Sequence, residues 1–445
     1  MSKSPGTCIR PTTTMKTKER EIASSRSLVL DLPPSCIEFC PAHPDHFVVG
    51  TYNLQKEEST VVDNDDVSDD GDTYETVKKP QSRNGSLVVF RLADNTDNAH
   101  DISHVQTVSY PSALLDLHFH PRQDKHEVLA TVSSTGTLSF FRLSPHQLPS
   151  APLVKLATHR PLGDEESVLF LSCAWHPSLA HFLAITTSDY QVHILRVDDS
   201  WGARQTSSVP IITHTLEAWT VAFSPFIATS QDMTDEIVPK GSHGLTIYSG
   251  GDDSKLFSTT CFYNEYHEDS AEDDDDIITK PYPIVTAKDH TAGVTAILPL
   301  PLTLSDGSGV VVTGSYDDSL RIYSIHPQIN GVMVRPPKLL AEENLAGGVW
   351  RLKLVKLEKL SGEGSTSRTD WSALILVSCM HAGSRVLKIS SDYSDFCEIA
   401  VLGRFEEHKS MNYGSDFQPG TELYGRPLRC VSTSFYDRLL CLWEF

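Results

Sequence analysis

Apolar and polar residues alternate along many short segments of this chain, and the segments recur in a fixed order. Each unit opens with an alternating run that ends in Ser-Pro or His-Pro, as in LLDLHFHP and EAWTVAFSP. A run rich in Val, Ser, Thr and Gly follows, then a turn with Asp or Gly, then a third alternating run. Alternation with period two predicts β-strands, and helical periodicity is nearly absent. The pattern therefore predicts an all-β protein.

Seven such units follow one another. A single unit cannot bury both of its faces, so repeated units are expected to stack around a common axis. We predict a single seven-bladed β-propeller of degenerate WD repeats over residues 26–445. Its expected blades span 26–92 (with a closing strand), 112–143, 168–197, 217–261, 292–325, 347–389 and 411–445.

The ends of the repeat array predict how the ring closes. Residues 1–25 are polar and are expected to form a disordered tail. The apolar run from Ser27 to Leu32 precedes the first unit and has no blade of its own, and the last unit has only three strands. Pairing of that run with the last unit would close the ring and remove two exposed sheet edges.

Charge is concentrated in two acidic stretches of a chain whose net charge is −21. Residues 53–84 hold nine acidic and four basic side chains, and residues 262–280 hold eight and one. Low hydrophobicity and high charge predict solvated insertions, and Asp273 to Asp276 in series lacks the ligand spacing of a calcium loop. This charge argues against nucleic acid as a partner, because phosphate binding requires Lys and Arg clusters.

The remaining composition indicates a cytoplasmic protein. No apolar stretch approaches the roughly 20 residues that cross a bilayer, and the first residues lack a secretory signal. The nine cysteines are scattered and none forms a CxxC pair, which is typical of reduced thiols and argues against a disulfide framework or a zinc site.

Asp pairs lie in the turns of the fourth and fifth units, at Asp252-Asp253 and Asp317-Asp318. Such residues bond their own backbone and tighten turns, so a structural role is expected. His290, just before a first strand, is a candidate for the histidine that WD repeats bond to such an aspartate.

Standard enzyme signatures such as GxSxG, HExxH, a Walker loop and GxGxxG are missing, so a binding scaffold is the default. Units six and seven nevertheless depart from the repeat, with Cys379 and His381 in one turn and Glu407, His408 and Ser410 in the next loop. On one face of a propeller these five side chains could form an acid–base set. The alternatives are structural histidines, a buried core cysteine and a loop serine.

Two tryptophans begin first strands, Trp219 in EAWTVAF and Trp350 in GGVWRLKL. They could line one mouth of the central channel and contact a ligand, or they could pack between blades. Tyr316, Tyr413 and His290 are the other residues expected to contact substrate, and no metal ligand or cofactor is expected.

Several strings are more specific than a generic propeller: SGGDDSKL, TGSYDDSLRIY, SCMHAGSRV, EEHKSMNYGSDF and STSFYDRLLCLWEF. From about unit four onward the chain resembles the diphthine methylesterase family, the WD-repeat proteins of diphthamide biosynthesis, and units one to three match only loosely. The resemblance implies hydrolysis of the methyl ester of methylated diphthine, a modified histidine of elongation factor 2, to diphthine and methanol. It implies no catalytic residues. The substrate carries a cationic trimethylammonio group, which an acidic protein attracts and a tryptophan can bind.

Two other functions remain open. The chain could be a non-catalytic adaptor that recruits the amidation step or another partner to elongation factor 2. It could also be an unrelated WD-repeat scaffold such as a ubiquitin-ligase receptor. In each case a monomer without a membrane or nucleic-acid partner is expected.

Overall fold

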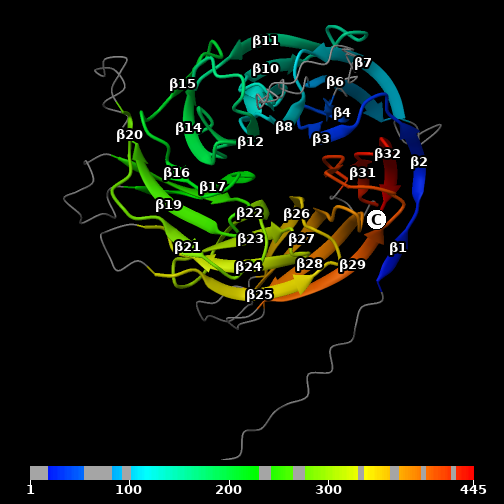
Figure 1. The fold of residues 1–445 in the computed structure, drawn as a ribbon. Helices are drawn as coiled ribbons and strands as arrows, with labels where there is room; N and C mark the ends of the chain where they lie inside the picture. Colours follow the sequence, from blue (N-terminus) through cyan, green and yellow to red (C-terminus); the bar gives the residue numbers. More distant parts are fainter. Residues whose placement is uncertain are drawn as a thin grey trace, which may run out of the picture.

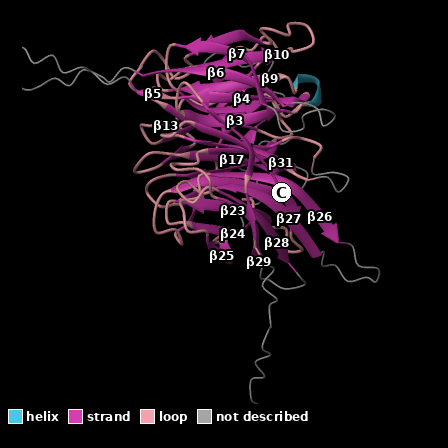
Figure 2. Cartoon of the chain, turned by 90° about the vertical axis from the view of Figure 1, so that its right-hand side faces the viewer, coloured by secondary structure: helices cyan, strands magenta, loops and turns pink. Residues whose placement is uncertain are grey.

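Seven β-sheets lie around one axis in the computed structural model, which describes residues 19–54, 83–92, 102–229, 242–263, 276–328, 335–360, 370–391, 397–421 and 427–445 (Figure 1). The predicted fold class, a seven-bladed β-propeller, is confirmed. Within the described ranges the only helical element is the 3₁₀ turn η1 (Gln123–Lys125), visible against the strands in Figure 2. None of the described elements is a helix of the length and hydropathy needed to cross a membrane.

The first three blades follow the chain from residue 34 onward, each with its innermost strand first. Blade 1 contains β3 (Pro34–Cys40), β4 (His43–Thr51), β5 (Asn53–Leu54), β6 (Arg83–Leu92) and β7 (Ile102–Tyr110). Blade 2 contains β8 (Leu114–Phe119), β9 (Val128–Ser133), β10 (Leu138–Leu143) and β11 (Leu153–His159). Blade 3 contains β12 (Phe170–Trp175), β13 (Phe182–Thr187), β14 (Gln191–Val197), β15 (Ala203–Gln205) and β16 (Ile212–Thr213).

The next three blades repeat this order. Blade 4 contains β17 (Thr220–Thr229), β18 (His243–Gly250), β19 (Leu256–Tyr263), β20 (Ile278–Thr279) and β21 (Val285–Ala287). Blade 5 contains β22 (Val294–Thr303), β23 (Gly309–Ser315), β24 (Ser319–Ile325) and β25 (Lys338–Asn344). Blade 6 contains β26 (Arg351–Leu360), β27 (Asp370–Ser378), β28 (Ser384–Ser391) and β29 (Glu398–Phe405).

Blade 7 is assembled from both ends of the described chain. It contains β30 (Gly414–Phe417), β31 (Arg429–Ser434) and β32 (Leu439–Glu444), and its outer strand is β2 (Ser24–Val29). The pairing of Leu28 with Leu440 and of Val29 with Leu439 is antiparallel, as the unpaired apolar run predicted. This strand covers the edge of β32 that would otherwise be open.

The N-terminal segment also reaches the neighbouring blade. Strand β1 (Arg20–Ile22) pairs in parallel with β29 of blade 6, and both strands lie along the outer edge of the ring in Figure 1. The expectation of a disordered tail through residue 25 is therefore wrong for residues 20–25. A short polar strand whose partner is far away in sequence gives no periodic signal, which is why it escaped notice.

The structure also places strands at the ends of the two predicted acidic insertions. Asn53 and Leu54 pair with Asn84 and Arg83, and Tyr263 pairs with Ile278. Residues 55–82 and 264–275 lie outside the described residues. The ordered blade thus extends further into each predicted insertion than composition indicated.

Apolar residues on both faces of each sheet pack against the adjacent blades. Val312 of β23 and Ile375 of β27, for example, are fully buried in one cluster between blades 5 and 6. Burial on both faces holds each blade at its place around the axis. The inner strands β3, β8, β12, β17, β22, β26 and β30 consequently surround a central channel.

Candidate functional site

The central channel contains a cavity of about 320 Å³ lined by residues of all seven blades. Tyr413 and Thr220 lie where the inner strands β30 and β17 begin, so they line one end of the cavity. We call this end the entry mouth. Pro121, Pro177 and Pro299 line the cavity elsewhere, after the inner strands β8 and β12 and within β22. The cavity is therefore reached along the axis of the ring.

Four aromatic side chains form a cluster at the entry mouth. The ring of Trp350 lies 5.7 Å from Trp219, 5.9 Å from Tyr316 and 4.8 Å from Tyr413, between centroids. Trp219 and Tyr316 are 6.5 Å apart and nearly perpendicular. All four side chains are partly exposed. The structure thus brings together four of the five residues that the sequence analysis assigned to substrate contact, and we call them the aromatic cluster.

The blade geometry explains why these residues meet. Trp219 and Trp350 immediately precede β17 and β26, and Tyr413 precedes β30. Tyr316 lies in the turn between β23 and β24, and this turn shares an end with the start of an inner strand because adjacent strands are antiparallel. Residues from blades 4, 5, 6 and 7 therefore converge on one rim of the channel.

A carboxylate adjoins the aromatic cluster. A Cβ atom on Gly293 would lie 2.4 Å from Oδ1 of Asp252 and 3.0 Å from the ring of Tyr316, so only glycine permits this approach. Burial raises the pKa of Asp252, and Glu217 and Asp253 raise it further. Burial also raises the pKa of Tyr316, with Asp252 as a second cause, so the phenol stays protonated at neutral pH. The rim therefore combines aromatic faces with an acidic side chain.

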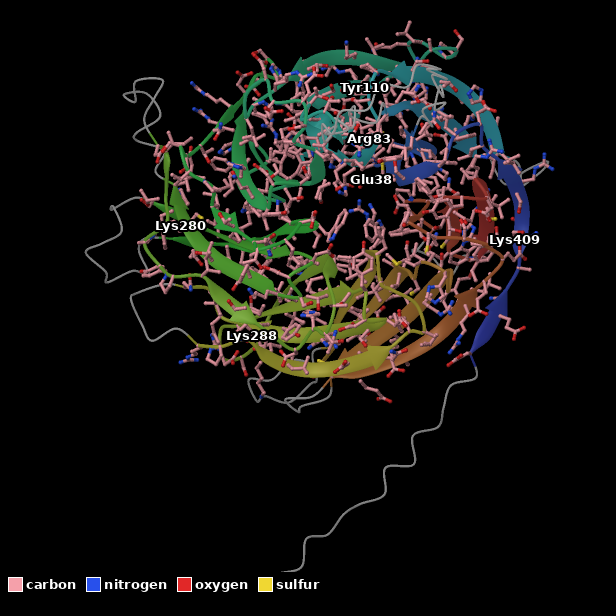
Figure 3. The ribbon with its side chains drawn as sticks, in the orientation of Figure 1. Glu38, Arg83, Tyr110, Lys280, Lys288 and Lys409 are labelled. Atoms are coloured by element: carbon pink, nitrogen blue, oxygen red, sulfur yellow. The ribbon has the colours of Figure 1, made fainter. Side chains whose placement is uncertain are left out.

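Deeper in the channel, charged side chains from blades 1, 2, 6 and 7 form ion pairs across the ring. Arg351 of β26 donates to Asp116 of β8 at 2.8 Å, and Lys353 of β26 donates to Glu38 of β3 at 2.7 Å. Figure 3 places Glu38 at the inner wall of the ring. We call the whole set the channel cluster; its members are Glu38, Asp116, His118, Arg351, Lys353 and Asp416.

His118 lies between two of these carboxylates. Its Nδ1 is 3.0 Å from Glu38 and its Nε2 is 3.4 Å from Asp116. Burial opposes the charged imidazole, but Asp116 and Glu38 outweigh it and raise the pKa of His118 to about 9. His118 is therefore a cation at neutral pH and cannot serve as a general base there.

The carboxylates of the channel cluster are less exposed than its cations. Burial alone would raise the pKa of Glu38, yet Lys353 and His118 lower it to about 2. Arg351 and His118 likewise hold the pKa of Asp116 below its usual range despite burial. Asp416 behaves differently, because burial together with Glu38 raises its pKa to about 6.

The channel cluster was not predicted from the sequence, although a signal was present. Asp116 and His118 in LLDLHFHP, and Arg351 and Lys353 in VWRLKLV, are two residues apart in predicted first strands. Positions i and i+2 of a strand face the same side. Charges repeated at that spacing in a strand predicted to be innermost indicate a charged channel wall.

The five residues proposed as an acid–base set have other surroundings. Cys379 is fully buried in the core between blades 5 and 6, and burial raises the pKa of its thiol to about 12. A thiol with that pKa supplies almost no thiolate at neutral pH. His381 is exposed in the turn between β27 and β28, and its catalytic role stays a prediction.

The loop after β29 attaches the neighbouring strands to one another. Glu407 accepts a hydrogen bond from the backbone N–H of Ser24 at 3.0 Å. Ser410 donates to Asp437 at 3.0 Å and lies 2.8 Å from Ser434 Oγ. Figure 3 shows Lys409, within this loop, at the outer side of the ring.

His408 is buried in the same loop, between blades 6 and 7. Its Nε2 lies 2.7 Å from Ser432 Oγ, and Trp443 donates to the same oxygen at 3.0 Å. Burial lowers the pKa of His408 to about 4, so its imidazole is neutral. Contacts of this kind hold strands together, and they differ from the general-base arrangement expected from the sequence.

His290 is also buried, with Nε2 2.9 Å from Thr313 Oγ1. This bond to threonine takes the place of the predicted bond between His290 and an aspartate. Because His290 is buried, it does not join the aromatic cluster at the entry mouth. The histidine–aspartate pair occurs one blade earlier, where His214 Nδ1 lies 3.0 Å from Asp253. His214 also precedes a first strand, but it lies further from that strand than His290 does from its own, so the sequence pattern did not single it out.

The chain is similar over nearly its whole length to curated proteins of one name. A diphthine methyltransferase of Schizosaccharomyces pombe is 27% identical over 93% of this chain and 95% of that protein. A diphthine methyltransferase homolog of Dictyostelium discoideum is 24% identical over 93% and 97%. The Homo sapiens diphthine methyltransferase is 26% identical over 87% and 73%. These relatives support a diphthamide-pathway family.

Two further comparisons bear on the fold and on the family. No protein-family model matches the chain. A chain in the crystal structure of the mitotic checkpoint complex superimposes with a TM-score of 0.50 at 12% identity, covering 100% of this chain and 97% of that one. That likeness supports the propeller fold alone. The diphthamide pathway agrees with the resemblance seen in the sequence, whereas the relatives carry the word methyltransferase where the resemblance implied a methylesterase.

Proposed function

We propose that this protein hydrolyses the methyl ester of methylated diphthine on elongation factor 2. Water adds to the ester carbonyl carbon, the bond from that carbon to the methoxy oxygen breaks, and the methoxy group leaves as methanol with one proton of the water. The second proton goes to solvent, and diphthine remains as a carboxylate. The reaction requires neither a cofactor nor a metal ion.

The aromatic cluster is the observation that carries this proposal. Trp219, Tyr316 and Trp350 have centroids within 6.5 Å of one another, the separation of rings in contact, so a cation would lie on the partly exposed side of the cluster, within the range of about 6 Å for a cation–π contact. Aromatic side chains suit quaternary ammonium groups, which have no N–H donors to satisfy. The trimethylammonio group of methylated diphthine is such a group.

The position of the aromatic cluster suits a substrate carried by another protein. A modified side chain that projects from a folded partner can enter the mouth of a propeller while the partner stays outside. The carboxylate of Asp252 beside the rings adds attraction for the cation, and a net charge of −21 adds a long-range field of the same sign.

Two other activities, methyl transfer and binding without catalysis, are distinguished from ester hydrolysis by one experiment. A methyltransferase, the word in the names of the relatives, would need a bound methyl donor, and the sequence lacks a glycine-rich loop after a strand. An adaptor would bind elongation factor 2 without changing it. The test is to incubate the purified protein with elongation factor 2 bearing methylated diphthine, with and without S-adenosylmethionine.

Methanol release and loss of the methyl group from the modified peptide, measured by mass spectrometry, are expected without the methyl donor. Gain of methyl groups that depends on the donor would instead identify a methyltransferase. An unchanged ester with retained binding to the factor would identify an adaptor. The variant Trp350→Ala is the matched comparison, because it removes the central ring of the aromatic cluster and should release methanol more slowly at low substrate concentration.

A further inference from the structure

We propose that the cations of the channel cluster form a binding site for a carboxyl group, and that Arg351 and His118 hold the ester carbonyl oxygen as negative charge develops on it. The choice of methylated diphthine as the natural ligand rests on the proposed function. The site itself is inferred from the charges and the cavity, and it would take any ligand that joins a quaternary ammonium group to a neighbouring carboxylate.

The first argument is the orientation of the charges. The side chains of His118, Arg351 and Lys353 are 32%, 24% and 29% exposed, whereas Asp116 and Asp416 are 1% and 5% exposed. His118, Arg351 and Lys353 line the cavity. The cations thus expose more of their side chains than the carboxylates do, although Asp116 also lines the cavity and Glu38 is 13% exposed.

The second argument is unused hydrogen-bonding capacity. Arg351 carries five N–H donors, and its hydrogen bonds at 2.8 and 3.4 Å both go to Asp116. The Asp116 carboxylate is fixed from behind by Ser172 Oγ at 2.9 Å and the backbone N–H of Cys173 at 3.1 Å. The guanidinium is therefore held in place and keeps donors for a second partner in the cavity.

The third argument is the surroundings. The cavity is also lined by Val221, Ala222, Ala296 and Leu298, which offer no hydrogen bonds from their side chains. Charges act more strongly on a ligand where water is scarce, and donors fixed before the reaction stabilise an oxyanion without reorganisation. Tyr413 of the aromatic cluster lines the same cavity.

These positions match the chemistry of the ligand. In methylated diphthine one carbon carries both the trimethylammonio group and the esterified carboxyl group. In this proposal the ammonium lies at the aromatic cluster and the carboxyl group on the channel side of it. The positive ammonium withdraws electrons from the adjacent carbonyl carbon, so hydroxide or water attacks it more readily, and Arg351 and His118 receive the resulting oxyanion.

Trimethylglycine, tetramethylammonium and acetate are the probes that test this site, titrated into the full-length protein by calorimetry and ligand-observed NMR. Trimethylglycine is expected to bind about tenfold more tightly than tetramethylammonium, because its carboxylate contacts the cations of the channel cluster. A tenfold difference in affinity corresponds to about 1.4 kcal/mol of binding free energy. The double variant Arg351→Met/Asp116→Asn removes one charge of each sign. It should abolish that advantage and leave tetramethylammonium binding unchanged.

A second variant covers the case in which the double variant does not fold. His118→Gln changes the most exposed member of the channel cluster and keeps hydrogen-bonding groups beside Glu38. It should lower trimethylglycine affinity several-fold without changing tetramethylammonium affinity, whereas Trp350→Ala should weaken both probes. Equal affinity of wild-type protein for trimethylglycine and tetramethylammonium, or variants that lose stability but keep the preference, would overturn the proposal.

The outcome is separable from that of the proposed function. Tight trimethylglycine binding without methanol release would leave the carboxyl site standing and remove the esterase. Methanol release with normal rates in His118→Gln and Arg351→Met/Asp116→Asn would keep the esterase and remove this site.

Discussion

Burial decides what Cys379 and His408 can do. The Cys379 thiol, with a pKa of about 12, stays protonated in the core, and the His408 imidazole, with a pKa of about 4, stays neutral beside Ser432. Both side chains connect neighbouring strands or blades. By contrast, the partly exposed His118 keeps its charge because two carboxylates flank it.

Replacement of His408 by alanine should affect stability more than turnover. The substitution removes the bond to Ser432 Oγ and leaves a gap between blades 6 and 7, which costs about 1–3 kcal/mol of unfolding free energy. Denaturant unfolding measures the loss, and activity per folded molecule should stay near the wild-type value. His381→Ala, in an exposed turn, is the control and should change stability by less than about 0.5 kcal/mol. Inactive His408→Ala protein of normal stability would return this residue to the active site.

Replacement of Trp350 by alanine should weaken substrate binding. Loss of a cation–π contact worth about 0.5–2 kcal/mol raises KM by roughly two- to thirtyfold. Steady-state kinetics on modified elongation factor 2 give the number. The control is Phe226→Ala, which removes a 40% exposed ring from β17, at a distance along the strand from Trp219. Equal effects of the two substitutions would argue against a cage at the entry mouth.

The raised pKa of His118 predicts a loss of stability at alkaline pH. Its folded pKa of about 9 exceeds the ordinary value of 6.5. The stabilisation that the charged imidazole gives the folded state is therefore fully present below about pH 6.5 and is lost as pH rises through 9. The melting temperature should fall over this window in the wild-type protein and fall less in His118→Gln. Asp416, with a pKa of about 6, titrates below the window. Identical pH profiles of the two proteins would show that His118 is not charged in the folded state.

At the scale of elements, two short strands at the N-terminal side hold two blades together. Strand β2 supplies the outer strand of blade 7, and β1 continues to the edge of blade 6. Glu407, in the loop that joins the two blades, accepts a hydrogen bond from Ser24, the first residue of β2. The segment therefore acts as a bridge as well as a closing strand.

Stepwise truncation should separate these two contributions. Removal of residues 1–23 deletes β1 and leaves β2 in place, so a modest fall in melting temperature is expected. Removal of residues 1–30 exposes the edge of β32, and an open, largely buried edge strand promotes aggregation. Light scattering during thermal unfolding distinguishes the two. Equal behaviour of both proteins would show that β2 adds nothing to β1.

Strand alternation predicted most of these elements, and geometry explains the rest. The run from Ser27 to Leu32 could be assigned because an apolar strand without a blade must pair somewhere. Arg20-Glu21-Ile22 has no such pattern, so β1 was missed. The aromatic cluster followed from position in the repeat, whereas the pairing of Arg351 with Asp116 depends on which blades face each other across the ring, and no local pattern encodes that.

At the scale of the whole molecule, the acidic stretch after β5 should be dispensable for the fold. Leu54 and Arg83 are paired across β5 and β6, so the two ends of residues 55–82 are adjacent. A two-residue Asn-Gly turn suits such an antiparallel pair and can replace the segment. Melting temperature and methyl ester hydrolysis should both be unchanged. Loss of hydrolysis with an intact fold would assign the segment a role in docking elongation factor 2.

The order of synthesis on the ribosome gives the β2–β32 pairing a consequence in the cell. Ser25 bonds Leu442, 417 positions later, so the earliest strand of blade 7 emerges long before its partner. Contacts so distant along the chain form late and slowly, and unpaired strands attract other chains meanwhile. Nascent protein must therefore wait with β2 unpaired, and chaperones that shield it should govern the yield of finished rings.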